Sequence, residues 1–154
     1  MKKIYETKVT SIGGREGEVF SPDRSFAFKT TAPGKRVENA TNPEQLFAAA
    51  YSACFNGALG LVMENAGETY PSEVSARVSL MSDEVEGFSV AVTLEVHLEG
   101  ATKEKAEELV AAAHQVCPPF FLRPVRAPGP AAFPLFLPAY TRPPAFFFRK
   151  HNSD

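Results

Sequence analysis

The chain contains two cysteines, and each lies on the apolar side of a predicted helix. Cys54 stands in "NPEQLFAAAYSACFNGAL" and Cys117 in "AAAHQVCP". A free cysteine is often a small core residue, and both cysteines fit that interpretation. The alternative is redox chemistry, in which one thiolate attacks a peroxide, becomes a sulfenic acid and condenses with the second thiol to a disulfide. The two residues and their spacing leave both interpretations open.

A buried thiol needs a nearby cation to ionise, because burial raises its pKa and a positive neighbour lowers it. Cys54 lies about three turns into its predicted helix, too far from the N-terminus for the helix dipole to contribute much. Arginine is the best candidate for the cation, since its guanidinium stays charged when it is removed from water. The same guanidinium could bind the peroxide oxygen that leaves as an alkoxide.

Two histidines suggest a competing chemistry, a Cys/His nucleophile pair or a zinc site. His97 lies in a predicted strand and His114 beside the apolar stripe of a predicted helix. Neither these residues nor the cysteines have the spacing of zinc ligands, and no CxxC pair occurs. We therefore expect no metal.

The helix predicted around Cys54 has clear start and stop signals. Asn42 is a suitable N-cap, Pro43 suits the first helical position and Glu44 lies in the first turn. The apolar pattern ends near Asn65, and Gly67 follows as a C-cap glycine. One predicted face carries Leu46, Ala50, Cys54, Ala58 and Leu61. Other faces are apolar too, which places this helix in the middle of the fold or at a subunit contact.

The remaining elements are mostly strands. Three short strands are predicted within residues 3–10, 15–21 and 25–31, with a loop over 32–41 before the helix. Alternating segments at 72–80 and 88–98 predict a hairpin. A second helix begins after Thr102 and carries an apolar stripe of Ala106, Leu109, Val110, Ala113, Val116 and Cys117. The order β-β-β-α-β-β-α indicates an α+β fold, with antiparallel sheet packed on two helices.

Composition narrows the possible functions. The 154 residues fit one domain, and the net charge of -2 gives no reason to expect nucleic-acid or anionic-membrane binding. We predict no membrane span, and the start "MKKIYETKV" lacks the apolar segment of a secretory signal. The expected location is the cytoplasm, where paired cysteines are more often catalytic or redox-sensing than structural.

The chain changes character after residue 118. Residues 119–154 are rich in proline, phenylalanine and arginine, and no helix or strand period is visible. The sequence therefore predicts a domain over 1–118 and a divergent tail over 119–154. A frameshift in a GC-rich gene could produce such a tail.

Three motifs together resemble the organic hydroperoxide resistance (Ohr) proteins of the OsmC/Ohr superfamily. They are "TNPEQLFAAAYSACFNGAL", "GGREGEVFS" and "AAAHQVCP", and the resemblance covers about residues 1–118. It implies that Cys54 is the peroxidatic cysteine and Cys117 the resolving one. It also implies that Arg15 polarises the thiolate and the peroxide, and that Glu44 holds Arg15 in place. The apolar residues Leu46, Phe47 and Phe55 would suit an alkyl substituent, although for any one of them core packing is the better explanation.

The resemblance carries further expectations. Family members are intertwined homodimers with active sites at the subunit interface. They reduce organic hydroperoxides, including those of fatty acids, and are themselves reduced by dihydrolipoyl groups of lipoylated proteins, with no bound cofactor. Family members also continue after the second cysteine with a polar turn and a final strand. Here that strand is expected to be missing or replaced.

Two alternative functions accompany this interpretation. One is an OsmC-type peroxidase with a broader peroxide range. The other is a non-catalytic redox-sensing or interaction protein, in which the tail has replaced turnover.

Overall fold

The computed structural model describes residues 2–85, 87–117 and 145–147. The chain divides into two compact units, Met1–Ala50 with Val78–Ala91 and Tyr51–Arg77 with Val92–Asp154. The long helix and both strands of the hairpin each run from one unit into the other. We describe each unit by itself.

A small four-stranded sheet with the order β1-β2-β3-β4 forms within the first unit. Its strands are β1 (Thr10–Ile12), β2 (Glu18–Phe20), β3 (Ala27–Thr30) and β4 (Ala40–Thr41). The first three pair antiparallel, whereas β4 pairs parallel with β3 through Lys29↔Ala40 and Thr30↔Thr41. β4 lies in the segment that was predicted to be loop. Its two residues are a strand only because they pair with β3, ten residues upstream, and the local sequence does not indicate that pairing.

The first predicted strands are displaced toward the C-terminus. Residues 2–9 form no strand, and Ile4 and Tyr5 are largely exposed, so an alternating pattern without a paired neighbour does not make a strand here. The predicted strand over 15–21 begins instead with a short 3-10 helix, η1 (Gly14–Glu16). Gly13 and Gly14 both have positive φ, a conformation that glycine adopts readily and that turns the chain before β2.

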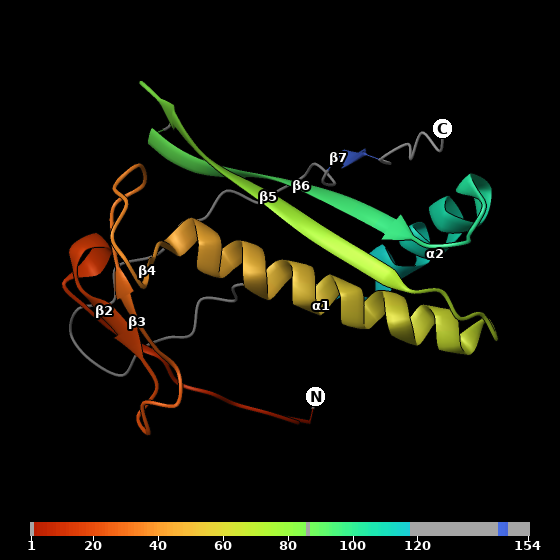
Figure 1. Cartoon of the computed structure of the whole chain (residues 1–154), viewed down its shortest axis with the longest axis horizontal. Helices are drawn as coiled ribbons and strands as arrows, with labels where there is room; N and C mark the ends of the chain where they lie inside the picture. The colour runs from red at the N-terminus through yellow and green to blue at the C-terminus, as the bar shows by residue number, and fades with distance from the viewer. Residues whose placement is uncertain (1, 86, 118–144, 148–154) are drawn as a thin grey trace. The chain divides into compact units, whose positions relative to one another are not determined.

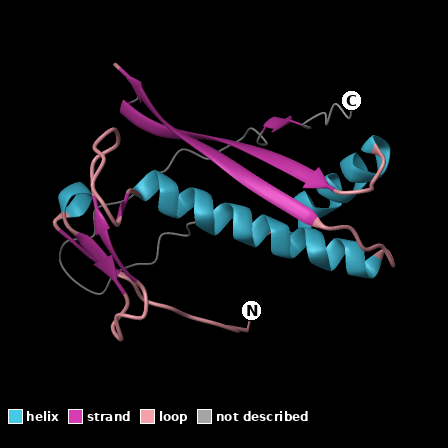
Figure 2. Ribbon diagram, in the orientation of Figure 1, coloured by secondary structure: helices cyan, strands magenta, loops and turns pink. Residues whose placement is uncertain are grey.

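Helix α1 (Pro43–Asn65) has the predicted bounds. The Asn42 side chain accepts a hydrogen bond from the Gln45 amide at 2.8 Å, which confirms the N-cap. At the other end Gly67 has φ 68°, and the Glu68 amide donates to the Met63 carbonyl at 2.9 Å. This is the Schellman arrangement expected of a C-cap glycine. Figures 1 and 2 show α1 as the longer of the two α-helices in the part of the chain that the structure describes.

Only part of the apolar surface of α1 is buried. Phe55, Ala58, Leu59 and Met63 are buried, whereas the predicted Ala50 and Leu61 are exposed. A helix that is apolar all round gives no sequence signal for which of its faces meets the core. Among the described residues, α1 alone is long and apolar enough to cross a membrane, but this is weak evidence since a core helix has the same composition.

The second unit holds the main hydrophobic core. The hairpin strands β5 (Ser72–Asp83) and β6 (Gly87–Leu98) are paired neighbours that run in opposite directions (Figure 1), as predicted. Helix α2 (Lys103–Val116) begins after Thr102, whose hydroxyl accepts from the Lys105 amide. The core is built from one face of each element: Phe55, Ala58, Leu59 and Met63 of α1, Leu94, Val96 and Leu98 of β6, and Ala106, Leu109, Val110 and Ala113 of α2, with Cys117.

A short strand from the tail joins the hairpin sheet. β7 (Ala145–Phe147) pairs parallel with β6, with Leu94 opposite Phe146. The sequence predicted no strand after residue 118. These three residues follow Pro143 and Pro144 and contain no proline, so their amides can enter a ladder. The rest of the predicted tail, with Pro118 and Pro119, lies outside the described residues.

Candidate active site

Arg15 and Glu44 form a two-point ion pair between η1 and the first turn of α1. The Arg15 Nη1 donates to Glu44 Oε2 at 2.9 Å, and Nη2 donates to Oε1 at 2.6 Å. This parallel arrangement is the geometry that guanidinium and carboxylate groups favour. The Glu44 side chain is 14% exposed and that of Arg15 is 41% exposed. The carboxylate therefore fixes the guanidinium while part of it stays accessible.

Each member of this ion pair stabilises the charged form of the other. The hydrogen bond from Arg15 lowers the pKa of the Glu44 carboxyl, and burial opposes this only in part. The hydrogen bond to Glu44 in turn raises the Arg15 pKa. Both groups are therefore charged over the physiological range. Next to Arg15, Glu16 forms an ion pair with Lys35, which connects η1 to the loop between β3 and β4.

Thr30 holds the turn that carries Arg15. Its hydroxyl donates to the Gly14 carbonyl at 2.7 Å and accepts from the Gly17 amide at 3.1 Å. Both ends of η1 are thus bound to one buried side chain of β3. Sequence reasoning missed Thr30. No local signal marks a threonine that bonds to a turn 13 to 16 residues upstream.

Gly17 closes the same turn for a steric reason. A Cβ at this position would lie 1.8 Å from the Ile12 carbonyl oxygen. Any other residue would force the backbone of η1 or β1 to move. The glycines of "GGREG" therefore shape the support of Arg15.

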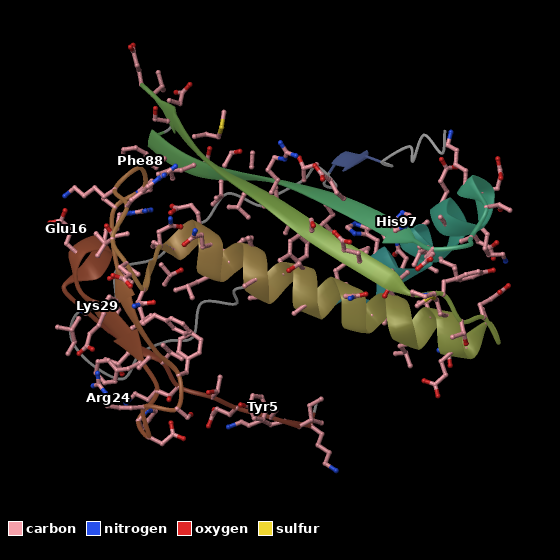
Figure 3. The ribbon with its side chains drawn as sticks, in the orientation of Figure 1. Tyr5, Glu16, Arg24, Lys29, Phe88 and His97 are labelled. Carbon is pink, nitrogen blue, oxygen red and sulfur yellow. The ribbon has the colours of Figure 1, made fainter. Side chains whose placement is uncertain are left out.

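A pocket of about 330 Å³ adjoins the ion pair within the first unit. Arg15 and Glu44 line it together with the apolar side chains of Phe47, Leu80, Phe88 and Val90. The last three come from the β5–β6 hairpin, and Figure 3 shows Phe88 near the start of β6. An apolar pocket with one fixed cation suits a ligand that has an alkyl or aryl group and a polar end. The hairpin residues were not predicted as site residues, since nothing local connects them to Arg15.

The three residues predicted to bind substrate occupy different environments. Phe47 lines the pocket. Leu46 is half-buried and is not part of the pocket lining. Phe55 is fully buried in the core of the second unit, which corresponds to the core-packing alternative.

The two cysteines meet in the second unit. Their Sγ atoms lie 3.7 Å apart although the residues are 63 positions apart in the sequence. Both are free thiols; Cys54 is half-buried and Cys117 is 5% exposed. Burial, then the hydrogen bond to Cys54, raises the Cys117 pKa to about 11. The contact is longer than an S–S bond of about 2.0 Å, so a small movement would suffice to close one.

Neither described histidine belongs to a group of side chains that could bind a metal. His97 is exposed near the end of β6 (Figure 3), and His114 is half-buried on α2. Within residues 2–85 and 87–117 no group of three or more His, Cys, Asp or Glu side chains could hold a metal ion. The expectation that no metal is bound remains a prediction.

The structure thus assembles two pairs from four predicted site residues. Arg15 with Glu44 belongs to the first unit, and Cys54 with Cys117 belongs to the second. Helix α1 contributes one member to each pair, Glu44 in its first turn and Cys54 ten positions later. The action of Arg15 on Cys54 joins residues of the two units and remains a prediction.

The sequence matches a protein-family model and is similar to known proteins of the same family. Residues 34–121 match the family model described as OsmC-like protein. The organic hydroperoxide resistance protein OhrA of Bacillus subtilis is 46% identical over 120 residues, which are 75% of this chain and 85% of the relative.

Solved structures agree with these matches. The crystal structure of OhrB of Bacillus subtilis is similar with a TM-score of 0.69 and 44% identity, covering 75% of this chain and 88% of that one. An organic hydroperoxide resistance protein from Legionella pneumophila has a TM-score of 0.70 and 38% identity, covering 76% and 88%. Both are similar enough in sequence for the likeness to extend beyond the fold.

Proposed function

The chain belongs to the OsmC-like family, in its organic hydroperoxide resistance group, and we propose that it is a thiol-dependent peroxidase that reduces organic hydroperoxides to alcohols. The observation that carries this proposal is the 3.7 Å approach of the Cys54 and Cys117 sulfurs. Two thiols this close can supply the two electrons that reduction of a peroxide requires, by forming a disulfide. The family relationship supplies the substrate class.

In the first proposed step the Cys54 thiolate attacks the terminal oxygen of the hydroperoxide. The O–O bond breaks, the alkoxide leaves and takes up a proton to become the alcohol, and Cys54 becomes a sulfenic acid. We assign Arg15 to the stabilisation of the thiolate and the departing alkoxide, and Glu44 to holding the guanidinium in position. The two-point bond between them supports this assignment, because a fixed donor needs no reorganisation during the reaction.

In the second proposed step the Cys117 sulfur attacks the Cys54 sulfur. The S–O bond breaks and the departing hydroxide combines with the proton of Cys117 to form water. The product is a Cys54–Cys117 disulfide. An external dithiol restores both thiols by exchange; following the family, we propose a dihydrolipoyl group of a lipoylated protein.

The pocket supports a preference for peroxides with a sizeable apolar group. Phe47, Leu80, Phe88 and Val90 offer apolar surface beside the Arg15 guanidinium. An alkyl or fatty-acid chain can bury surface there, whereas hydrogen peroxide cannot. We propose organic hydroperoxides as the main substrates, and a homodimer in the cytoplasm as the working form.

The test is to react the fully reduced protein with one equivalent of cumene hydroperoxide and to measure its intact mass. We expect a rapid loss of two hydrogens, which marks the disulfide. Cys54→Ser should not react. Cys117→Ser should gain oxygen instead, as sulfenic or overoxidised Cys54.

The outcomes separate the alternatives. No mass change in the wild type would contradict the peroxidase and favour a non-catalytic interaction protein, whereas disulfide formation without sustained turnover would favour a redox sensor. Equal rates with cumene hydroperoxide and hydrogen peroxide would point to the broader OsmC type. A much higher rate with cumene hydroperoxide agrees with the proposal.

A further inference from the structure

We propose that Cys117 acts before the disulfide forms: in the reduced protein its thiol donates a hydrogen bond to Cys54 and stabilises the negative charge on that sulfur. This role deepens the proposed function, in which Cys117 otherwise acts only after Cys54 has been oxidised. It would make Cys117 a second donor to the reacting sulfur besides Arg15. It also explains why the two sulfurs are in contact while both are still reduced.

The geometry places the donor on Cys117. Its Sγ is directed at the Cys54 Sγ at 3.7 Å, within the range of a hydrogen bond between two sulfurs. A neutral thiol is a weak donor, but its bond strengthens when the acceptor is ionised. The bond therefore favours the thiolate of Cys54 over its thiol.

The difference in burial decides which sulfur keeps its proton. Cys117 is 5% exposed, whereas Cys54 is only half-buried. A charge costs more on the more buried sulfur, so burial favours keeping the proton on Cys117. The raised pKa of Cys117 has the same cause, burial first and the contact with Cys54 second.

Other titratable side chains lie in the core that holds the pair, or next to the pair in the sequence. The described core cluster around it includes two tyrosines, Tyr51 of α1 and Tyr70 before β5. The Tyr70 hydroxyl donates to Glu68 at 2.9 Å. His114 lies one turn before Cys117 on α2. Any test must therefore report on Cys54 itself rather than on total ionisation.

The proposed donor also suits the step that follows. Once Cys54 is a sulfenic acid, the proton that Cys117 kept is the one that converts the departing hydroxide to water. One proton thus stabilises the attacking thiolate first and the leaving group afterwards. No further acid is needed for disulfide closure.

The test compares Cys117→Ala with Cys117→Ser in the full-length, reduced protein without peroxide. Serine keeps a donor and alanine does not, and neither can form the disulfide. The rate of Cys54 alkylation by iodoacetamide is measured against pH, and the label is located by peptide mass. We expect the Cys54 pKa to be similar in the wild type and in Cys117→Ser. In Cys117→Ala we expect a higher pKa, with alkylation about tenfold slower below it.

Equal Cys54 pKa values in the alanine and serine variants would overturn the proposal. A second readout uses only the wild type and Cys54→Ala, in case the alanine variant of Cys117 fails to fold. At a pH where Cys54 is ionised, the infrared S–H stretch of Cys117 should lie at lower frequency in the wild type than in Cys54→Ala. An identical frequency would also overturn it.

These results are independent of peroxidase turnover. A protein that shows the pKa difference but does not react with cumene hydroperoxide would have the donor and lack the proposed function. A protein that forms the disulfide without the pKa difference would have the function and lack the donor.

Discussion

Two pairs of side chains carry the chemistry that we propose for this protein, and each pair combines a charged or ionisable group with a partner that contacts it. Glu44 fixes Arg15 through two hydrogen bonds, and Cys117 contacts Cys54 through sulfur. In both pairs the more buried member is the supporting one. The member to which we assign contact with substrate is therefore the more accessible one.

The Arg15–Glu44 pair predicts a pH-dependent stability. The folded-state pKa of Glu44 is lowered, so its contribution is present above the ordinary glutamate pKa of about 4.3 and is lost as pH falls further. Glu44→Gln should lower the thermal midpoint at neutral pH, and the gap should shrink below about pH 4. Thermal unfolding of both proteins from pH 7 to pH 3 tests this. A gap that is constant over this range would contradict it.

Cys117 predicts the opposite dependence at high pH. Its folded-state pKa of about 11 lies above the ordinary cysteine value of about 8.5, so the folded protein binds this proton more tightly than the unfolded chain. The stability contribution is complete below about pH 8.5 and falls as pH rises toward 11. Denaturant unfolding of reduced wild type and Cys117→Ala should show a steeper alkaline loss in the wild type. Parallel curves would argue against it.

At the scale of elements, local signals predicted the helices well and the strands less well. The capping residues Asn42 and Gly67 lie within a few positions of the ends of α1, so both ends of the helix could be predicted from the sequence. β4 forms only by pairing with β3, ten residues away, and no local sequence pattern indicates that pairing. The Arg15–Glu44 bond spans 29 positions and was expected only from the family resemblance.

The two hydrogen bonds of the Thr30 hydroxyl lead to a prediction about how much β3 stabilises η1. Thr30→Val keeps the shape but leaves the Gly14 carbonyl and the Gly17 amide without their shared partner. We expect a loss of about 1–3 kcal/mol in the free energy of unfolding, with slower reaction at Cys54 if Arg15 acts there. Thr30→Ser keeps the hydroxyl and should lose less. Denaturant unfolding of the three proteins measures the difference, and equal losses in both variants would contradict the hydrogen-bond role.

At the scale of the whole molecule, α1 contributes residues to both units, as β5 and β6 also do. The sequence predicted that this helix would be apolar on nearly every face, and the chain buries only part of it. Leu61 is 47% exposed and Ala50 is exposed as well. Which face would be covered could not be read from the sequence, because that choice depends on where the other elements pack.

The exposed apolar residues of α1 fit the proposed homodimer. We expect sedimentation velocity to give the mass of two chains. Leu61→Glu should shift the protein toward the mass of one chain, since a charge is costly in an apolar contact. Lys103→Glu on α2 is the control and should leave the mass unchanged. A wild type that sediments as one chain would exclude the homodimer.

The contact between Cys54 and Cys117 has a further consequence for the lifetime of the protein. A disulfide there would link positions 63 residues apart and would restrict the unfolded chain by about 4 kcal/mol of conformational free energy. The oxidised enzyme would then open less often to proteases than the reduced one. In the cycle that we propose each turnover passes through this disulfide, so a cell short of reductant would accumulate the protein in its oxidised, more protease-resistant form.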